Sequence, residues 1–281
     1  MRSRLRLLKV ALGLTQYCKF CTVIDSAYYS EYFFGILFSM TINKIYDNLQ
    51  ELEAERTSRH LLLPGFTHEH QQLLRDAKIC MVGAGGLGSP CLLSLAAAGV
   101  GEITICDDDV VELSNLQRQT LYTVDQCGKS KAQLAAKRLQ ALSPGLKINL
   151  VDRFNEDNAK QLVESHDLII DGCDNFATRF LIADAAWSVG APEVYGSVLY
   201  YEGQVSVFVP GKGPSLRDLY ACPPPKEKVP KSAVLGATAA IVGAMMATEA
   251  IKIITGIGKP LIGVLARYNA IDNSLRHFRF A

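Results

Sequence analysis

A glycine-rich run is the first part of this 281-residue chain whose residue types and spacing suggest chemistry. The run Gly83-Ala-Gly-Gly-Leu-Gly88 fits the pattern GxGxxG. Such glycines allow a tight turn and let the backbone approach phosphate groups, while a following helix N-terminus binds their charge. We therefore expect a phosphate site at Gly83, Gly85, Gly86 and Gly88. The pattern alone does not separate NAD, FAD and ATP.

Polar residues downstream of the loop favour ATP. Asp107 follows about twenty residues later, where a carboxylate binds ribose hydroxyls in nucleotide folds. Asn115, Arg118 and Lys131 come next. Hydride transfer needs no extra cations at the phosphates, whereas reaction at an α-phosphorus builds charge that Arg and Lys offset.

Asp174 completes this set as the candidate Mg²⁺ ligand, because Mg²⁺ prefers carboxylate and phosphate oxygens. Arg118 or Lys131 alone would be interpreted as a solvated surface charge. Together with the glycine loop and Asp174, they predict an adenylating site.

The elements that must position these residues alternate regularly. Apolar segments predict strands at 78–83, 102–106, 148–151 and 167–171, and helices lie between them at 86–98, 129–142 and 156–165. This alternation predicts an α/β protein with a Rossmann-like, doubly wound, mostly parallel sheet.

A different pattern follows residue 192. We expect a strand at 194–197, a half-exposed antiparallel strand at 203–209 and a loop over 210–230. We also expect a helix at 233–255 and two closing strands within 261–281. The strands of this C-terminal part are expected to be antiparallel.

Composition limits the classes of partner. The chain is 49% hydrophobic and 20% charged, with a net charge of +1, which indicates a globular protein and argues against bulk nucleic-acid binding. Its eight cysteines lie mostly in apolar runs, so we expect a reducing cytoplasm.

Residues 1–39 form an uncertain N-terminal extension. They contain no run of about 20 apolar residues and no clear cleavage site, so we expect neither a membrane span nor a secretory signal. An over-long start assignment is favoured over a targeting or membrane-touching segment. A helical pattern then runs from residue 42 to 56.

Seven motifs in order carry a family resemblance over roughly residues 55–281. They are Arg59-His-Leu-Leu-Leu-Pro-Gly-Phe66, Gly83–Gly88, Asp107 with Asp109, Ser114-Asn-Leu-Gln-Arg-Gln119, Gly128-Lys-Ser-Lys131, Asp171-Gly-Cys-Asp-Asn175 with Thr178-Arg179, and Ala247-Thr-Glu-Ala-Ile-Lys252. This set resembles the ThiF/MoeB family, the bacterial relatives of ubiquitin-activating E1 enzymes.

The resemblance implies ATP-dependent, Mg²⁺-assisted adenylation of the C-terminal carboxylate of a small ubiquitin-like carrier protein, with release of pyrophosphate. The carrier would resemble ThiS or MoaD and end in Gly-Gly. Residues 40–281 would form the adenylation domain, with a nucleotide-binding half at 78–192 and a carrier-binding half at 193–281. The carrier tail would lie under a crossover loop near residues 197–235.

The resemblance also assigns roles to individual residues. The glycine loop would bind the ATP phosphates, Asp107 the ribose, and Asn115, Arg118 and Lys131 the triphosphate. Arg59 resembles an arginine that family dimers lend to the other subunit, so we expect a homodimer.

Two departures from the family concern cysteine. Many members hold zinc through two CxxC pairs in the C-terminal half, but only Cys222 lies beyond residue 173, so we expect no zinc site. Cys18 and Cys21 lack nearby partner ligands and are interpreted as chance spacing.

Relatives with a metal-free loop also tend to carry a cysteine before the last long helix, where this chain has Ser232. We therefore expect a sulfur donor supplied by another protein. Cys222 is the nearest substitute, although burial or a filler role is favoured for it, and Cys173 lies beside carboxylates that make a thiol less reactive. A covalent intermediate on either cysteine stays open.

Three alternatives remain at this point. One is adenylation of another target, such as a peptide or a tRNA. An NAD-dependent oxidoreductase would leave Arg118, Lys131 and Asp174 unexplained. A non-catalytic scaffold would be expected to lose the phosphate-binding residues.

Overall fold

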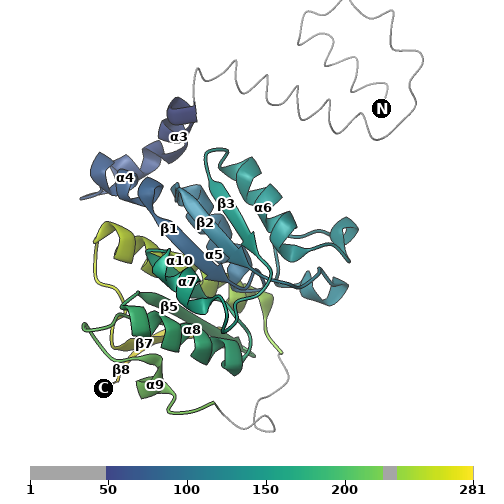
Figure 1. Cartoon of the computed structure of the whole chain (residues 1–281), viewed down its shortest axis with the longest axis vertical. Coiled ribbons are helices and arrows are strands. Elements are labelled where there is room, and N and C mark those ends of the chain that lie inside the picture. Colours follow the sequence, from purple (N-terminus) through teal and green to yellow (C-terminus); the bar gives the residue numbers. More distant parts are fainter. Residues whose placement is uncertain (1–48, 224–232, 281) are drawn as a thin grey trace, which may run out of the picture. The chain divides into compact units, whose positions relative to one another are not determined.

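One eight-stranded sheet organises the computed structural model, which describes residues 49–223 and 233–280 (Figure 1). Its strand order is β3-β2-β1-β4-β5-β6-β7-β8. The first five strands pair in parallel and the last three are antiparallel. The strands are β1 (Lys78–Val82), β2 (Glu102–Cys106), β3 (Lys147–Val151), β4 (Leu168–Asp171), β5 (Glu193–Leu199), β6 (Glu202–Phe208), β7 (Val264–Asn269) and β8 (Ser274–Arg279).

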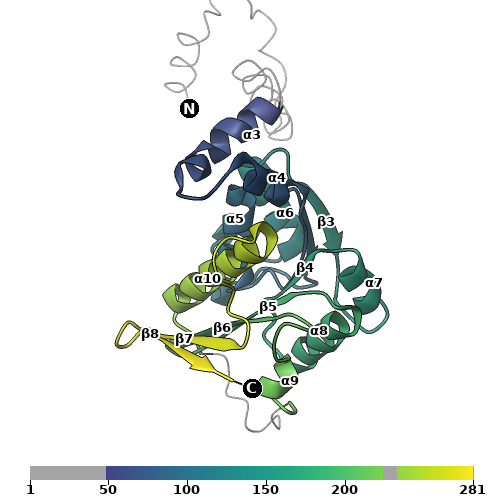
Figure 2. The same ribbon diagram turned by 90° about the vertical axis from the view of Figure 1, so that its left-hand side faces the viewer.

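Helices cover both faces of this sheet, as Figure 2 shows. One face packs against α5 (Gly88–Ala98), α6 (Lys131–Leu142) and α10 (Gly236–Thr255), and the other against α7 (Ala159–Glu164) and α8 (Phe176–Val189). The remaining elements are α3 (Leu49–Thr57), η1 (Ser58–Leu62), α4 (His68–Asp76), η2 (Leu113–Asn115), η3 (Val124–Gln126) and α9 (Leu216–Leu219).

The parallel strands form because their residues are apolar and covered on both faces. Ile79 and Met81 of β1 point into the cluster under α5, whereas Cys80 and Val82 point into the cluster under α7 and α8. Continuous apolar runs are typical of strands in such sheets. The predicted doubly wound α/β fold is confirmed, and the carboxyl ends of the parallel strands meet at one edge.

Helix α10 is a core helix. It is long and apolar enough to cross a membrane by length and composition, but Val242, Met246 and Ala250 are fully buried in the cluster it shares with the sheet. Glycine in the sheet lets the helix approach the strands closely, because a Cβ atom on Gly203 of β6 would overlap Val242 of α10.

Several predicted boundaries shift in the structure. Helices α5, α6, α7 and α10 each begin two or three residues later than predicted. Strand β6 is not half-exposed, because Val205 and Val207 face α10 while Phe208 packs beside α8. The loop predicted over 210–230 contains α9, whose start is fixed by a capping box between Ser215 and Asp218.

Other expectations fall wholly or partly outside the described residues. Residues 1–48 are not among the described residues, and the extension at 1–39 and Cys18 and Cys21 lie there. The helix predicted over 42–56 is described only from Leu49, where α3 begins. Ser232 and most of the proline-rich part of the crossover loop also lie outside the described residues.

Candidate nucleotide site

The glycine loop connects β1 to α5 at the carboxyl edge of the sheet. Gly83 has a φ of +93°, which disfavours any other residue, and a Cβ atom there would lie 2.7 Å from the carbonyl oxygen of Gly172. A Cβ atom on Gly88 would overlap the carbonyl oxygen of Gly83. The loop after β1 therefore lies directly against the loop after β4, and only glycine fits at these positions.

Asp107, at the end of β2, holds the glycine loop. Its Oδ2 accepts a hydrogen bond from the N–H of Ala84 at 2.7 Å, and its Oδ1 accepts one from the N–H of Asp109 at 3.0 Å. Burial raises the pKa of the Asp107 carboxyl, while the Ala84 hydrogen bond and the charge of Lys131 oppose that rise. The structure brings the carboxylate predicted for ribose binding into contact with the predicted phosphate loop.

Lys131 begins α6 and is nearly buried, with 5% of its surface exposed. Its Nζ donates to Oδ2 of Asp109 at 2.9 Å. The Ser130 side chain caps the helix by accepting the N–H of Gln133. A buried ammonium beside Asp107 and Asp109 is not the solvated surface charge that a lone lysine would suggest.

Residues 115–122 lie across the glycine loop and contact three successive loop residues. A Cβ atom on Gly86 would lie 3.3 Å from Cγ and Cδ of Arg118, and one on Gly85 would lie 3.5 Å from Nε2 of Gln119. The hydroxyl of Tyr122 donates to the carbonyl oxygen of Ala84 at 2.8 Å. The segment therefore forms a wall of the phosphate site.

Asn115 and Arg118 take different positions in this wall. The buried Asn115 side chain accepts the N–H of Glu112 through Oδ1, which starts the turn. Arg118 is half-buried, and its guanidinium donates to the carbonyl oxygen of Ser114 at 3.2 Å. Arg118 therefore lies at the loop and carries charge to it, whereas the Asn115 side chain is used within the turn that precedes Arg118.

Asp174 is exposed in the loop that follows β4. Arg179 of α8 fixes that loop, because its Nε donates to Oδ2 of Asp171 at 2.8 Å and its Nη2 donates to the carbonyl oxygen of Cys173 at 2.9 Å. The same guanidinium donates to the carbonyl oxygen of Gly196 at 3.1 Å. Sequence reasoning quoted Arg179 in a motif but gave it no role.

The pKa of Arg179 is raised further above its ordinary value. Burial by itself would lower the pKa, but the Asp171 carboxylate together with Tyr195 and Cys173 outweighs burial. The guanidinium also lies 4.9 Å from the ring centre of Tyr195. An arginine with one carboxylate, two carbonyls and an aromatic ring around it is a permanent structural cation.

Arg59 does not join the other candidates. It is exposed on η1, and the neighbouring Thr57 and Gln71 contact Gly99, the residue that ends α5. The glycine loop lies at the opposite end of this 11-residue helix, roughly 16 Å away. Arg59 therefore does not reach the glycine loop of its own chain.

The two candidate cysteines differ in setting. Burial raises the pKa of the Cys173 thiol, and the Asp171 carboxylate raises it further, which keeps the thiol protonated and weakly nucleophilic. Cys222 is exposed, so burial, one of the two roles favoured for it, was wrong, and the filler role stays a prediction.

Metal ligands do not cluster in the part of the chain that the structure describes. No three His, Cys, Asp or Glu side chains there lie close enough to hold a metal ion. Cys18 and Cys21 lie outside this part, so the absence of zinc stays a prediction. A carboxylate such as Asp174 would bind Mg²⁺ only together with phosphate oxygens.

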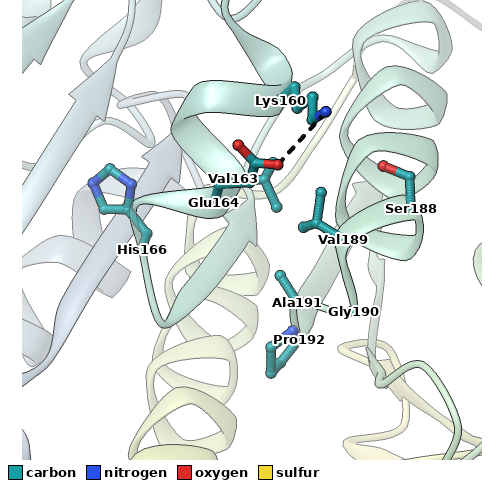
Figure 3. A pocket seen from close by; sticks show the side chains of 9 residues that line it. All are labelled: Lys160, Val163, Glu164, His166, Ser188, Val189, Gly190, Ala191 and Pro192. Atoms are coloured by element: carbon teal, nitrogen blue, oxygen red, sulfur yellow. Dashed lines mark ion pairs between the residues drawn. The ribbon is translucent and has the colours of Figure 1, made fainter.

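A surface pocket of about 590 Å³ lies at the opposite edge of the sheet (Figure 3). His166 and Pro192, which line it, come just before β4 and β5. Lys160 and Glu164 form an ion pair at its rim, with 3.7 Å between Nζ and Oε1. The pocket therefore shares no residue with the glycine-loop site.

The sheet and the glycine-loop site together define a doubly wound α/β protein with a GxGxxG loop at the carboxyl edge of its sheet and two buried or half-buried cations beside that loop. Within that class, the chain belongs to the ThiF family, whose model matches residues 57–281. The resemblance seen in the motifs is confirmed.

Curated relatives fall into the same group. The chain is 48% identical over 236 residues to a probable adenylyltransferase/sulfurtransferase MoeZ of Mycobacterium tuberculosis, covering 81% of this chain but only 60% of that relative. It is 44% identical over 233 residues to a sulfur carrier protein adenylyltransferase of Thermus thermophilus, covering 80% and 86% of the two chains. It is 39% identical to a SAMP-activating enzyme E1 of Haloferax volcanii, covering 80% and 84%.

Solved structures show the same fold. Escherichia coli MccB in complex with MccA-N7isoASN aligns with a TM-score of 0.74 at 20% identity, covering 81% of this chain and 72% of MccB. A selenomethionine form of PaaA aligns with a TM-score of 0.70 at 22% identity, covering 99% and 82%.

Proposed function

We propose that this protein uses ATP to adenylate the C-terminal carboxylate of a small ubiquitin-like sulfur-carrier protein, releasing pyrophosphate. The observation that carries the proposal is the contact of Arg118 with Gly86, beside the buried Lys131 and Asp107. Relatives at 44% and 39% identity are named as a sulfur carrier protein adenylyltransferase and a SAMP-activating enzyme, which supports the carrier as substrate class.

The reaction needs no general base. A free α-carboxyl has a pKa of roughly 3.5, so the carrier tail is ionised and attacks the α-phosphorus directly. The glycine loop and the N-terminus of α5 would bind phosphoryl oxygens, and Asp107 the ribose. Arg118 and Lys131 would offset the charge that develops as pyrophosphate leaves.

The residues present fit a magnesium ion. Asp174 offers an exposed carboxylate in the loop after β4, which touches the glycine loop through Gly83 and Gly172. Mg²⁺ bound there together with phosphate oxygens would neutralise the triphosphate charge. Asn115 would help to orient the triphosphate from the opposite wall.

A homodimer would supply the missing arginine. Arg59 is exposed at the far end of α5, and Leu62 and Leu63 beside it are 71% and 53% exposed. Exposed apolar side chains next to an exposed arginine suit a face shared by two copies. Arg59 of one subunit would then complete the phosphate site of the other.

The carrier half and the sulfur step are proposed on sequence grounds. The carrier tail would approach beneath the crossover loop near residues 197–235, in the half formed by residues 193–281. The adenylate would then pass to a sulfur donor on another protein, in a reducing cytoplasm. Cys222, being exposed, keeps open a covalent intermediate on this chain.

Exchange of labelled pyrophosphate into ATP tests the proposal. The wild-type chain should catalyse exchange only when a carrier ending in Gly-Gly is present, and Asp174→Ala should abolish it while the melting temperature stays the same. Exchange driven by a peptide or a tRNA instead would replace the carrier as substrate. Binding of NAD more tightly than ATP would overturn the proposal altogether.

A further inference from the structure

Within the described residues, Gln119 is the member of the wall across the glycine loop that has a buried polar atom without a hydrogen-bond partner. Arg118 donates to the carbonyl oxygen of Ser114, and Tyr122 donates to that of Ala84. The Gln119 side chain makes no hydrogen bond in this part of the chain, and its Oε1 is a buried atom without a partner. Its backbone, in contrast, is fully used in the turn from Asn115 to Tyr122.

An unpaired buried acceptor is energetically unfavourable, so proteins rarely retain one without a reason. The side chain is 4% exposed and packed against the loop, with Nε2 3.5 Å from the position of a Cβ atom on Gly85. Unlike Oε1, the unpaired Nε2 atom is not buried, so it keeps contact with solvent at the loop. The amide therefore presents a donor where the loop is open to phosphate.

We propose that Gln119 is a nucleotide-contacting residue whose Nε2–H donates to a phosphoryl oxygen held above Gly85. This inference rests on the proposed function and adds a neutral donor to the charged ones at Arg118 and Lys131. A carboxamide suits this place because it donates to an anion without adding charge. Its close packing fixes the donor before ATP arrives.

Isothermal titration of the full chain with ATP and with adenosine tests the role. Gln119→Met keeps the shape of the side chain but removes the donor and the unpaired oxygen. We expect ATP affinity to fall about tenfold, adenosine affinity to stay within about twofold and the melting temperature to stay equal or rise. Gln119→Glu should weaken ATP binding further by charge repulsion, and it serves as the second variant if the Met variant misfolds.

The matched control is Gln133→Met on the exposed face of α6, which should change neither affinity. ATP affinity in Gln119→Met within twofold of wild type would overturn the inference, as would a parallel loss of adenosine binding and melting temperature. In either case wild-type ATP binding would remain intact. Failure of the wild-type chain to bind ATP would instead count against the proposed function itself.

Discussion

At the scale of single residues, two buried carboxyl groups on the neighbouring strands β4 and β5 differ in whether they have a charged partner. Asp171 is fully buried but paired with Arg179, whereas Glu193, 1% exposed at the start of β5, has a buried Oε1 without a partner among the described residues. Burial raises the pKa of Glu193 well above its ordinary value, and the nearby Asp171 and Asp184 carboxylates add to the rise against the charge of Arg179. Glu193 is therefore held neutral.

This raised pKa predicts a pH-dependent stability. Below the ordinary pKa of glutamate, the folded and unfolded chains are both protonated at residue 193. As pH rises, the unfolded chain releases the proton while the folded chain retains it, so the stability cost of Glu193 grows until pH passes its folded pKa and stays constant above it. Glu193→Gln removes the titration, and its gain in melting temperature over wild type should be larger at pH 8 than at pH 5.

Thermal melts of both proteins at the two pH values measure this difference. Glu156→Gln on an exposed site is the control and should show the same melting temperatures as wild type. An equal gain for Glu193→Gln at both pH values would show that residue 193 does not titrate in this range.

Sequence predicted several residues that the structure brings together at the glycine loop and missed those that support them. The glycine loop, Asp107, Arg118 and Lys131 share one site because the spacing from strand to helix fixes where each one falls. Arg179 and Tyr122 act through contacts with residues whose position depends on the folded chain, such as the carbonyl oxygens of Gly196 and Ala84. No local pattern encodes such contacts.

At the scale of elements, helix α10 depends on small residues in the sheet beneath it. Gly203→Ala would drive a methyl group into Val242 and should lower the free energy of unfolding by about 1–3 kcal/mol or more. Urea denaturation measures the loss. The double variant with Val242→Ala should be less destabilised than the sum of the two single variants, because removing the valine methyls makes room.

Gly145→Ala is the control for this prediction, since a Cβ atom there meets only Glu53 at an ordinary 3.6 Å. A loss of equal size at Gly145 and Gly203 would mean that the contact with Val242 of helix α10 does not account for the loss at Gly203.

Element prediction worked where periodicity was strong and failed where it was weak. Helix α8 was missed because apolar residues lie on nearly all its sides, so no single face stands out. Its ends carried usable signals: Asn175 caps the N-terminus by accepting the N–H of Thr178, and Gly190 ends the helix with a φ of +80°. The start of α6 moved because the Ser130 cap, not apolar spacing, sets where that helix begins.

At the scale of the whole molecule, the position of Arg59 predicts shared sites. Mixing Arg59→Ala with Asp174→Ala protein should restore exchange, because in a mixed dimer the first subunit keeps Asp174 and receives Arg59 from the second. Up to about half of wild-type activity per mixed dimer is expected, since only one of two equivalent sites is complete. Pyrophosphate exchange after subunit mixing, with mixed dimers verified by native mass spectrometry, measures it.

Neither variant alone should regain activity on dilution and reassociation. Verified mixed dimers without recovered exchange would exclude a contribution of Arg59 across the subunit boundary.

The ion pair between Lys131 and Asp109 has a consequence for the resting protein. The Lys131 side chain is 6% exposed, whereas the Asp109 side chain that it pairs with is 70% exposed. The Asp109 carboxylate therefore occupies the position beside the ammonium group that a phosphate would take. Any incoming anion must displace that carboxylate. Its binding therefore gains only the difference in free energy between its own ion pair with Lys131 and the Lys131–Asp109 pair. Small anions, with few loop contacts to add, face this built-in competitor at a disadvantage. A triphosphate that spans the glycine loop, as the proposed function requires, would overcome it, and the pair would then favour polyvalent ligands over small anions.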